Sequence, residues 1–175
     1  MSSTESDLKN YVALISIDGV GPKTFFRIKS FLNKTRTSWS QFWGDHGGVW
    51  AKLRLNKKIG ESIRELIKEH KLFKSWYQLK RDQISVISFW SKAYPSLLKE
   101  IDDPPPLLFV KGPIKLLKNC SKQYPLAVVG TRRMTAYGKM VTKKIASELA
   151  LAGAAVVSGF MYGVDVTAQQ AAVKA

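Results

Sequence analysis

The chain has 175 residues, of which 45% are hydrophobic and 23% are charged, with a single cysteine at Cys120. This composition excludes the disordered class, and one cysteine excludes an internal disulfide or a cysteine-rich metal site. The apolar runs fall well short of the roughly 18 residues that span a bilayer, and the N-terminus carries acids and hydroxyls where a secretory signal would be basic and apolar. We therefore expect a cytoplasmic protein without membrane contact.

The charge balance is strongly positive. Lys and Arg number 28 against 13 Asp and Glu, which gives a formal net charge of +15. The excess is spread along the chain, with 18 basic against 9 acidic residues in 1–100 and 10 against 4 in 101–175. Such a balance favours a polyanionic partner, chiefly nucleic acid and less often an anionic membrane. The alternative is a solvated surface, which the alternating charges of residues 52–81 favour for that stretch.

The first forty residues predict two short helices around a glycine turn. Apolar residues recur at helical spacing on both sides of the turn, and Pro22 suits the first position of the second helix. These residues are Leu8, Tyr11, Val12 and Ile15 before the turn, and Phe25, Ile28 and Leu32 after it. Residues 36–50 hold three tryptophans among glycines, which predicts an irregular stretch packed under the helices. A third, longer helix is expected from Ile59 to about Lys80.

The pattern changes near residue 83. Residues 84–88 read as a strand, and the proline-rich segment 102–106 is a stiff connector that no helix can cross. Three short apolar runs follow at 107–110, 126–130 and 154–159, as expected of strands buried on both faces. Between the last two, Tyr137, Val141, Ile145 and Leu149 repeat every fourth residue, and another helix starts near Val164. Strand, helix and strand in this order predict an α/β fold with a parallel sheet.

Two glycine-containing loops follow the last two strands, at residues 130–138 and 158–165. In an open parallel sheet, ligands bind beyond the carboxyl ends of the strands, where backbone N–H groups and helix N-termini face an anion. Arginines at a helix start can hold phosphate, so the loops predict a site for a polyanion backbone. The candidate residues are Gly130, Thr131, Arg132, Arg133, Ser158, Gly159, Tyr162 and Gly163. The alternative is that the glycines only make tight turns and the arginines are solvated.

No cofactor or metal is expected from these loops. Neither matches G-x-G-x-x-G, and Gly138-Lys139 lacks the Ser or Thr of a nucleoside-triphosphate loop. The two histidines, His46 and His70, lie away from the loops, and no cluster has metal-ligand spacing. Asp165 could be a general base, but a helix cap is the preferred interpretation. The sequence therefore predicts no catalytic residues and no enzyme.

The glycine turn of the first two helices is a second candidate contact. Gly19 and Gly21 expose backbone N–H groups between the helices, and Lys23 adds a positive charge. This resembles the helix-hairpin-helix motif, which grips DNA phosphates without reading sequence. The alternative is a turn with no DNA role.

Together these residues resemble the DprA/Smf family of DNA-processing proteins. The resemblance rests on YPSLL at 94–98, IDDPPPLLFVKG at 101–112, VVGTR at 128–132 with YG at 137–138, and SGFMYGVD at 158–165. Three motifs in the family's order and spacing make the resemblance specific over 84–175. Over 1–80 the resemblance is weaker. It implies a small helical SAM-like or helix-hairpin-helix domain over 1–80 and a Rossmann-like domain over 81–175.

The resemblance also implies a function. The family binds single-stranded DNA without known catalysis, helps load RecA recombinase in natural transformation (competence) and recombination, and commonly self-associates as a homodimer. By position, Arg132 would be the basic residue of the phosphate pocket. Tyr162 stands where the family commonly has Lys or Arg, and Gln169 where it usually has His. The family continues beyond the point matching Ala175, so we expect a fragment, or a shortened relative whose sheet is completed by a partner or left incomplete.

Two other functions remain open from the sequence. A nucleotide-binding hydrolase of the lysine-decarboxylase-like (LOG) group also uses glycine loops on a Rossmann-like sheet, but its PGGxGTxxE loop does not occur here. Alternatively, residues 1–80 form a protein-interaction module with no DNA role.

Overall fold

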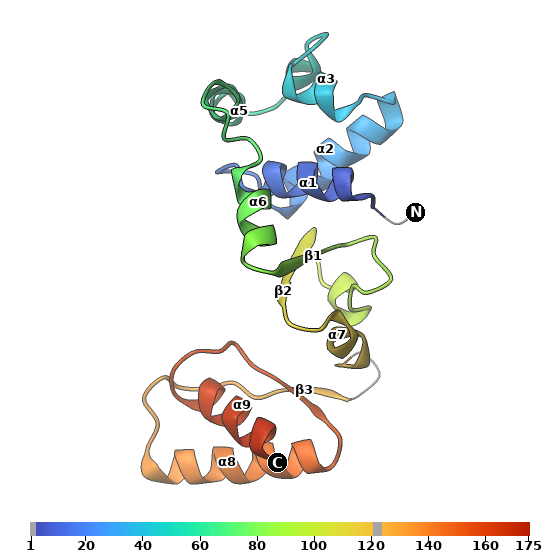
Figure 1. Cartoon of the computed structure of the whole chain (residues 1–175). Helices are drawn as coiled ribbons and strands as arrows, with labels where there is room; N and C mark the ends of the chain where they lie inside the picture. Colours follow the sequence, from blue (N-terminus) through green and yellow to red (C-terminus); the bar gives the residue numbers. More distant parts are fainter. Residues whose placement is uncertain (1–2, 121–123) are drawn as a thin grey trace. The chain divides into compact units, whose positions relative to one another are not determined.

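A computed structural model of the chain describes residues 3–120 and 124–175 (Figure 1). The chain divides into two compact units, Met1–Ile114 and Lys115–Ala175. In the described residues, no helix is both long enough and apolar enough to cross a membrane.

The first unit begins with six helices. They are α1 (Glu5–Ile15), α2 (Pro22–Thr35), α3 (Trp39–Trp43), α4 (Val49–Lys52), α5 (Lys57–Lys68) and α6 (Lys74–Arg81). The two helices predicted around the glycine turn are confirmed, with Pro22 at the start of α2. The stretch predicted to be irregular instead forms α3 and α4, because the Ser38 hydroxyl caps α3 and Gly48 adopts a positive φ at the start of α4.

Aromatic side chains make up much of the core of this unit. Phe25 and Phe42 are fully buried, and Trp43 and Trp50 are nearly so, as the sequence predicted for the tryptophan-rich stretch. The indole N–H of Trp43 donates to Oδ1 of Asn10 at 2.7 Å. That of Trp50 donates to the carbonyl of Phe42 at 2.7 Å. Both buried indole donors are therefore satisfied, which allows the rings to pack in the interior.

The predicted helix from Ile59 to Lys80 is wrong as a single element. The α5 helix stops at Lys68, His70 adopts a left-handed φ of 54°, and the Lys71 N–H turns back to the Leu66 carbonyl at 2.8 Å. This left-handed termination satisfies carbonyls that the helix end leaves open. The chain re-enters helix at Lys74, so two shorter helices meet at a bend.

A two-stranded ribbon completes the first unit. The β1 strand (Ile84–Ser88) pairs antiparallel with β2 (Leu107–Lys111), in a register that joins Ile84 to Lys111 and Ser88 to Leu107. A short 3-10 helix, η1 (Leu97–Lys99), lies between them. The prediction that 107–110 is a strand of a parallel sheet buried on both faces is wrong, since β2 pairs antiparallel with β1 and Phe109 is exposed.

The ribbon explains why the compact unit runs past residue 80. Leu107 belongs to the same hydrophobic core as the helices, and Val86 and Trp90 pack against that core. The contacts therefore divide the chain after Ile114. The division into domains 1–80 and 81–175 stays a prediction.

The second unit has the α/β order that the sequence predicted. Its elements are α7 (Ile114–Cys120), β3 (Pro125–Ala127), α8 (Ala136–Leu151), β4 (Ala155–Val157) and α9 (Val164–Lys174). The β3 and β4 strands pair in parallel, with Leu126 opposite Val156. The parallel sheet and the α/β fold class are therefore confirmed.

Small side chains join α8 and α9, which lie side by side in Figure 1. Ala146 of α8 packs with Ala168 and Ala171 of α9, and Val128 and Val156 close the cluster. The buried face of α8 is thus not the repeat beginning at Tyr137, which is 72% exposed. The prediction that these strands are buried on both faces is also wrong here, because the helices cover one face and leave Val157 exposed on the other.

Candidate nucleic-acid interface

The loops that follow β3 and β4 lie next to each other. We refer to residues 130–138 as the first glycine loop and to residues 158–165 as the second glycine loop. The pairing of the strands continues up to their starts, since the Val128 N–H donates to the Val157 carbonyl at 3.0 Å. Both loops therefore leave the sheet at the carboxyl ends of parallel strands, where α/β proteins bind ligands.

Hydrogen bonds join the two loops directly. The Asp165 carboxylate is 7% exposed and accepts from the backbone N–H of Gly130 at 3.3 Å. The Val164 N–H donates to the Thr131 carbonyl at 3.2 Å. The prediction that Asp165 caps its own helix is wrong, because α9 has no side-chain cap and the carboxylate faces the other loop. Asp165 thus links the two loops through a hydrogen bond.

The glycines permit the close approach of the loops. Gly163 has a φ of 95°, and a Cβ there would meet the Thr131 carbonyl oxygen and lie 2.7 Å from Cα of Arg132. A Cβ at Gly130 would lie 2.8 Å from Cγ2 of Val164. A Cβ at Gly159 would lie 2.9 Å from Oδ2 of Asp165. Gly163 is therefore required by the backbone of the first glycine loop, beyond the needs of a tight turn, and a Cβ at Gly130 or Gly159 would crowd Val164 or the Asp165 carboxylate.

The first glycine loop presents two arginines. Arg132 and Arg133 are exposed, and neither forms an ion pair with a carboxylate in the part of the chain that the structure describes. The Thr131 hydroxyl accepts from the Arg133 N–H at 3.1 Å, which fixes the turn between them. The loop then enters α8, whose first turn is capped by Thr135 and holds no acidic residue. Two guanidinium groups and a helix N-terminus thus face solvent together, an arrangement that attracts anions.

The second glycine loop presents aromatic side chains. Tyr162, which the sequence marked as a candidate, is 82% exposed. Phe160 is 75% exposed in a left-handed conformation, and sequence reasoning missed it. Its signal was a large apolar residue between loop glycines, where no hydrophobic periodicity supports burial. Exposed rings beside guanidinium groups can stack on nucleobases.

Ser158 differs from the other candidates. Its hydroxyl donates to the Val128 carbonyl at 2.6 Å, so its proton is used within the fold. The side-chain amide of Gln169 donates to the Ser158 carbonyl at 3.2 Å. Ser158 therefore stabilises the second glycine loop through hydrogen bonds within the fold, and its hydroxyl does not present a donor to solvent.

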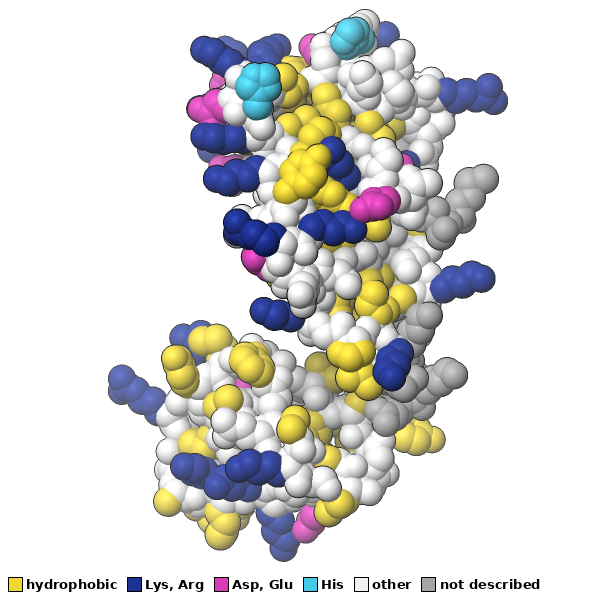
Figure 2. Space-filling view, viewed as in Figure 1, with side chains coloured by type: hydrophobic (Ala, Val, Ile, Leu, Met, Phe, Trp, Pro, Cys, Tyr) yellow, Lys and Arg dark blue, Asp and Glu magenta, His cyan; other side chains and the backbone are white. Residues whose placement is uncertain are grey.

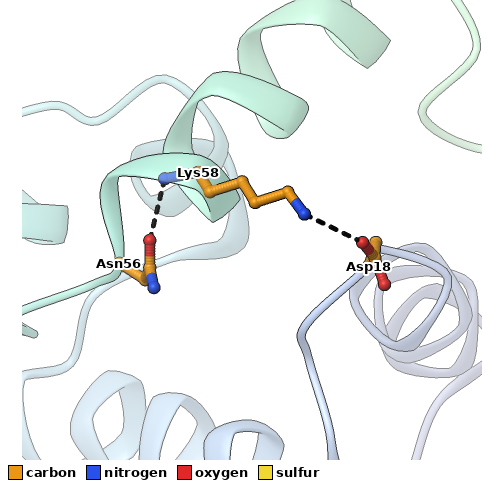
Figure 3. Close-up of polar contacts among 3 residues, drawn as sticks. All are labelled: Asp18, Asn56 and Lys58. Atoms are coloured by element: carbon orange, nitrogen blue, oxygen red, sulfur yellow. Dashed lines mark hydrogen bonds and ion pairs between the residues drawn. The ribbon is translucent and has the colours of Figure 1, made fainter.

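The glycine turn of the first unit has a different character. Gly19 has a φ of 84°, Gly21 precedes α2, and residues 15–21 line a shallow hollow of about 490 Å³. Lys23 pairs with Asp103 at 3.3 Å, with its side chain 84% exposed. The turn is joined to α5 by an ion pair between Asp18 and Lys58 at 3.4 Å, and Asn56 caps that helix (Figure 3). The local charges here are partly neutralised, unlike those of the first glycine loop.

The described residues of the two units contain no group of three or more histidine, cysteine or acidic side chains that could hold a metal ion. His46 and His70 both lie in the first unit.

The fold and the joined loops define an α/β protein of the parallel-sheet class with paired glycine loops. The chain belongs to the DNA recombination-mediator protein A family, whose model matches residues 85–175, about half of the chain. This is the DprA/Smf family that the sequence motifs resemble, so that prediction is confirmed.

Relatives agree with this assignment. The chain is 44% identical over 92 residues to DNA processing protein DprA of Bacillus subtilis strain 168, covering 53% of this chain and 30% of that protein. It is 27% identical to Protein Smf of Synechocystis over 97% of this chain and 42% of that protein. The structure of DprA from Streptococcus pneumoniae matches 99% of this chain and 55% of its own, at 25% identity and a TM-score of 0.69. The chain thus spans about a third to a half of these relatives.

Proposed function

We propose that the chain binds single-stranded DNA independently of sequence and acts in DNA processing linked to recombination. The observation that carries the proposal is the pair of exposed arginines, Arg132 and Arg133, on a glycine loop locked to its neighbour by Asp165. The family's name, and the DNA processing named for its relatives, support a nucleic-acid substrate.

The geometry suits a DNA backbone better than a free nucleotide. Guanidinium groups form paired hydrogen bonds with phosphate oxygens, and such contacts position a strand without reading its bases. Phe160 and Tyr162 add exposed rings on which any base can stack. In this proposal Tyr162 contributes stacking where other family members contribute a charge. Backbone and stacking contacts together give affinity without sequence preference.

The test is a filter-binding titration of the full chain with a 20-nucleotide oligothymidine at several salt concentrations. With about five phosphate contacts, log K should fall with log[salt] at a slope near −3.5, and each arginine replaced by alanine should reduce the slope by about 0.7. Lys144→Ala, on the same unit but farther along α8, should change affinity much less. Unchanged affinity and slope in both Arg132→Ala and Arg133→Ala would refute the assignment.

The proposal is one of binding without catalysis. The LOG-type hydrolase is not favoured, because the family match is to DNA recombination-mediator protein A. Hydrolysis would release free base from a nucleoside monophosphate. Incubation of the chain with adenosine monophosphate, followed by chromatography, should yield no adenine. Measurable release would overturn this part of the proposal.

The glycine turn of the first unit is proposed as a weaker DNA contact through Gly19, Gly21 and Lys23. Its alternative is the protein-interaction role. Deleting residues 1–80 would cut through a core that includes Leu107, so a point substitution is the sharper test. Lys23→Ala should lower affinity for oligothymidine about twofold, and no change would leave the interaction role as the better reading.

Partners beyond DNA are proposed from the family resemblance. They are RecA recombinase, loaded onto strands during natural transformation, and a second copy of the chain, in the cytoplasm. Light scattering would report the dimer, and cosedimentation with RecA on single-stranded DNA would report the recombinase contact. A monomer that leaves RecA unaffected would limit the chain to DNA binding.

A further inference from the structure

A groove of about 730 Å³ lies in the first unit at the bend between α5 and α6. Its volume is within the range of ligand-binding pockets. It exists because α5 ends at the left-handed His70 and α6 starts again at Lys74, so that both helices and the bend line it. It lies outside the two glycine loops and outside the turn at Gly19.

The floor of the groove is apolar and partly aromatic. Leu72 and Phe73 are half-buried, whereas Tyr77 is 60% exposed. Lys9 contacts both rings, because its ammonium donates to the Tyr77 hydroxyl at 2.9 Å and lies 4.2 Å from the centre of the Phe73 ring and 5.0 Å from that of Tyr77. The face of this unit seen in Figure 2 has hydrophobic side chains open between Lys and Arg side chains. The Tyr77 ring is therefore open to solvent beside the apolar floor.

The rim of the groove is positive. Lys71, Lys74 and Arg81 line it, and no acidic side chain does so. Lys71 pairs with Glu69 at 2.7 Å, and Arg81 contacts the adjacent Asp82 at 3.5 Å, so these two positive charges are partly neutralised. Lys74 has no ion pair with any carboxylate among the residues described. The net charge of the rim remains positive.

We propose that this groove is a second contact for single-stranded DNA, with one base stacked on Tyr77 and the flanking phosphates held by Lys74 and Arg81. An exposed ring next to cations is the combination that single-stranded nucleic acid recognises. An acidic amphipathic helix needs a stripe of anchors repeating over two or more turns, and this floor offers only a short apolar cluster. The inference presupposes the DNA binding proposed above but concerns a different surface.

The first test compares affinities for a 30-nucleotide oligothymidine in the full chain. Tyr77→Ser removes the ring and should weaken binding about five- to tenfold, whereas Tyr77→Phe keeps the ring and should change it less than twofold. Lys74→Glu should weaken binding by at least fivefold. Lys34→Glu makes the same charge change at an exposed position on α2 and serves as the matched control. Equal effects of Lys74→Glu and Lys34→Glu, with no effect of Tyr77→Ser, would overturn the inference.

The second test maps the contact directly. Oligothymidine carrying 5-iododeoxyuridine is irradiated with the full chain, and the adducts are located by mass spectrometry. Adducts at Tyr77 or Phe73 support the inference, whether or not adducts also form at the glycine loops. Adducts at Phe160 or Tyr162 alone overturn it and leave the proposed function standing. No adduct at all also overturns the inference, whereas the proposed function stands or falls on the filter-binding titration.

An acidic peptide is the competing occupant. If it were the true ligand, Lys74→Glu and Tyr77→Ser would weaken binding of a labelled peptide of alternating Glu and Leu, and neither would alter oligothymidine binding. That outcome would overturn the DNA assignment of the groove.

Discussion

The Asp165 carboxylate accepts the backbone N–H of Gly130 at 3.3 Å, and this bond joins the start of α9 to the loop that leaves β3. Residues 35 positions apart in the sequence are thereby held in contact. Because Arg132 and Arg133 lie two and three residues after Gly130, the bond also holds the backbone that carries the two guanidinium groups. The tie therefore preorganises the proposed phosphate contact, which lowers the ordering cost of binding.

Substitutions at Asp165 should show whether its hydrogen bond or its negative charge holds the two loops together. Asp165→Ala leaves the Gly130 N–H without its acceptor and should lower the free energy of unfolding by about 1–3 kcal/mol. Asp165→Asn retains an oxygen acceptor and should cost less. Urea denaturation, with hydrogen exchange followed in residues 125–175, would measure both. A loss for Asp165→Asn equal to that for Asp165→Ala would show that charge, rather than the hydrogen bond, joins the loops.

Gly163→Ala should be more damaging than a substitution at another glycine of positive φ. Gly163 and Gly153 have φ values of 95° and 83°, but a Cβ at Gly153 meets nothing within 4 Å. Gly153→Ala thus carries backbone strain alone, about 1–3 kcal/mol. Gly163→Ala adds overlap with the backbone of Thr131 and Arg132, so we expect it also to weaken oligothymidine binding. Thermal denaturation and filter binding would compare the pair, and equal effects would contradict the close-approach argument.

The buried bond between Trp43 and Asn10 should matter more than an exposed one. Asn10→Ala leaves the indole N–H of Trp43 without an acceptor in the core, and should cost about 1–3 kcal/mol. Thr35→Ala removes a hydroxyl that donates to the Phe31 carbonyl at 2.8 Å on the surface, and should cost well under half as much. Urea denaturation followed by tryptophan fluorescence would measure both. A similar loss in the two variants would contradict the role of burial.

Alkaline pH should destabilise the first unit through Tyr11. Burial, helped by the Asp7 carboxylate, raises the pKa of Tyr11 to about 12 from its ordinary value of 10.0. The folded state thus holds the phenol proton more tightly, and this contribution is complete below about pH 10 and is lost as pH rises toward 12. Two pKa units correspond to about 2–3 kcal/mol. Tyr11→Phe should remove that part of the decline in unfolding free energy between pH 10 and 12, and an unchanged decline would contradict it.

Local sequence signals were enough to predict several elements. Pro22 marks the start of α2, and the short apolar runs mark β3 and β4, because the backbone rules that these residues obey act over a few positions. The glycine loops were found the same way. Because each loop follows a strand that was predicted to be parallel, both loops were expected at the carboxyl edge of the sheet, where they lie.

Long-range packing was beyond the reach of these signals. Residues 107–110 are equally apolar in a parallel or an antiparallel sheet, and only their pairing with β1 and the placing of Leu107 in the helical core decide between them. Likewise, the repeat at Tyr137 suggests one face of α8, but the close contact with α9 selects Ala146. Small side chains carry a weak hydrophobic signal, although they allow helices to approach most closely.

The sequence by itself determined the family, the positive charge, the α/β order and the glycine loops, since all of these follow from residue types and their spacing along the chain. Only the tertiary structure decided that Asp165 ties the loops together and that Tyr77 lies open in a basic groove where a continuous helix was predicted. The physical reason is that a hydrogen bond or a bend depends on which distant groups are brought within a few ångströms of each other. Sequence spacing does not encode that distance.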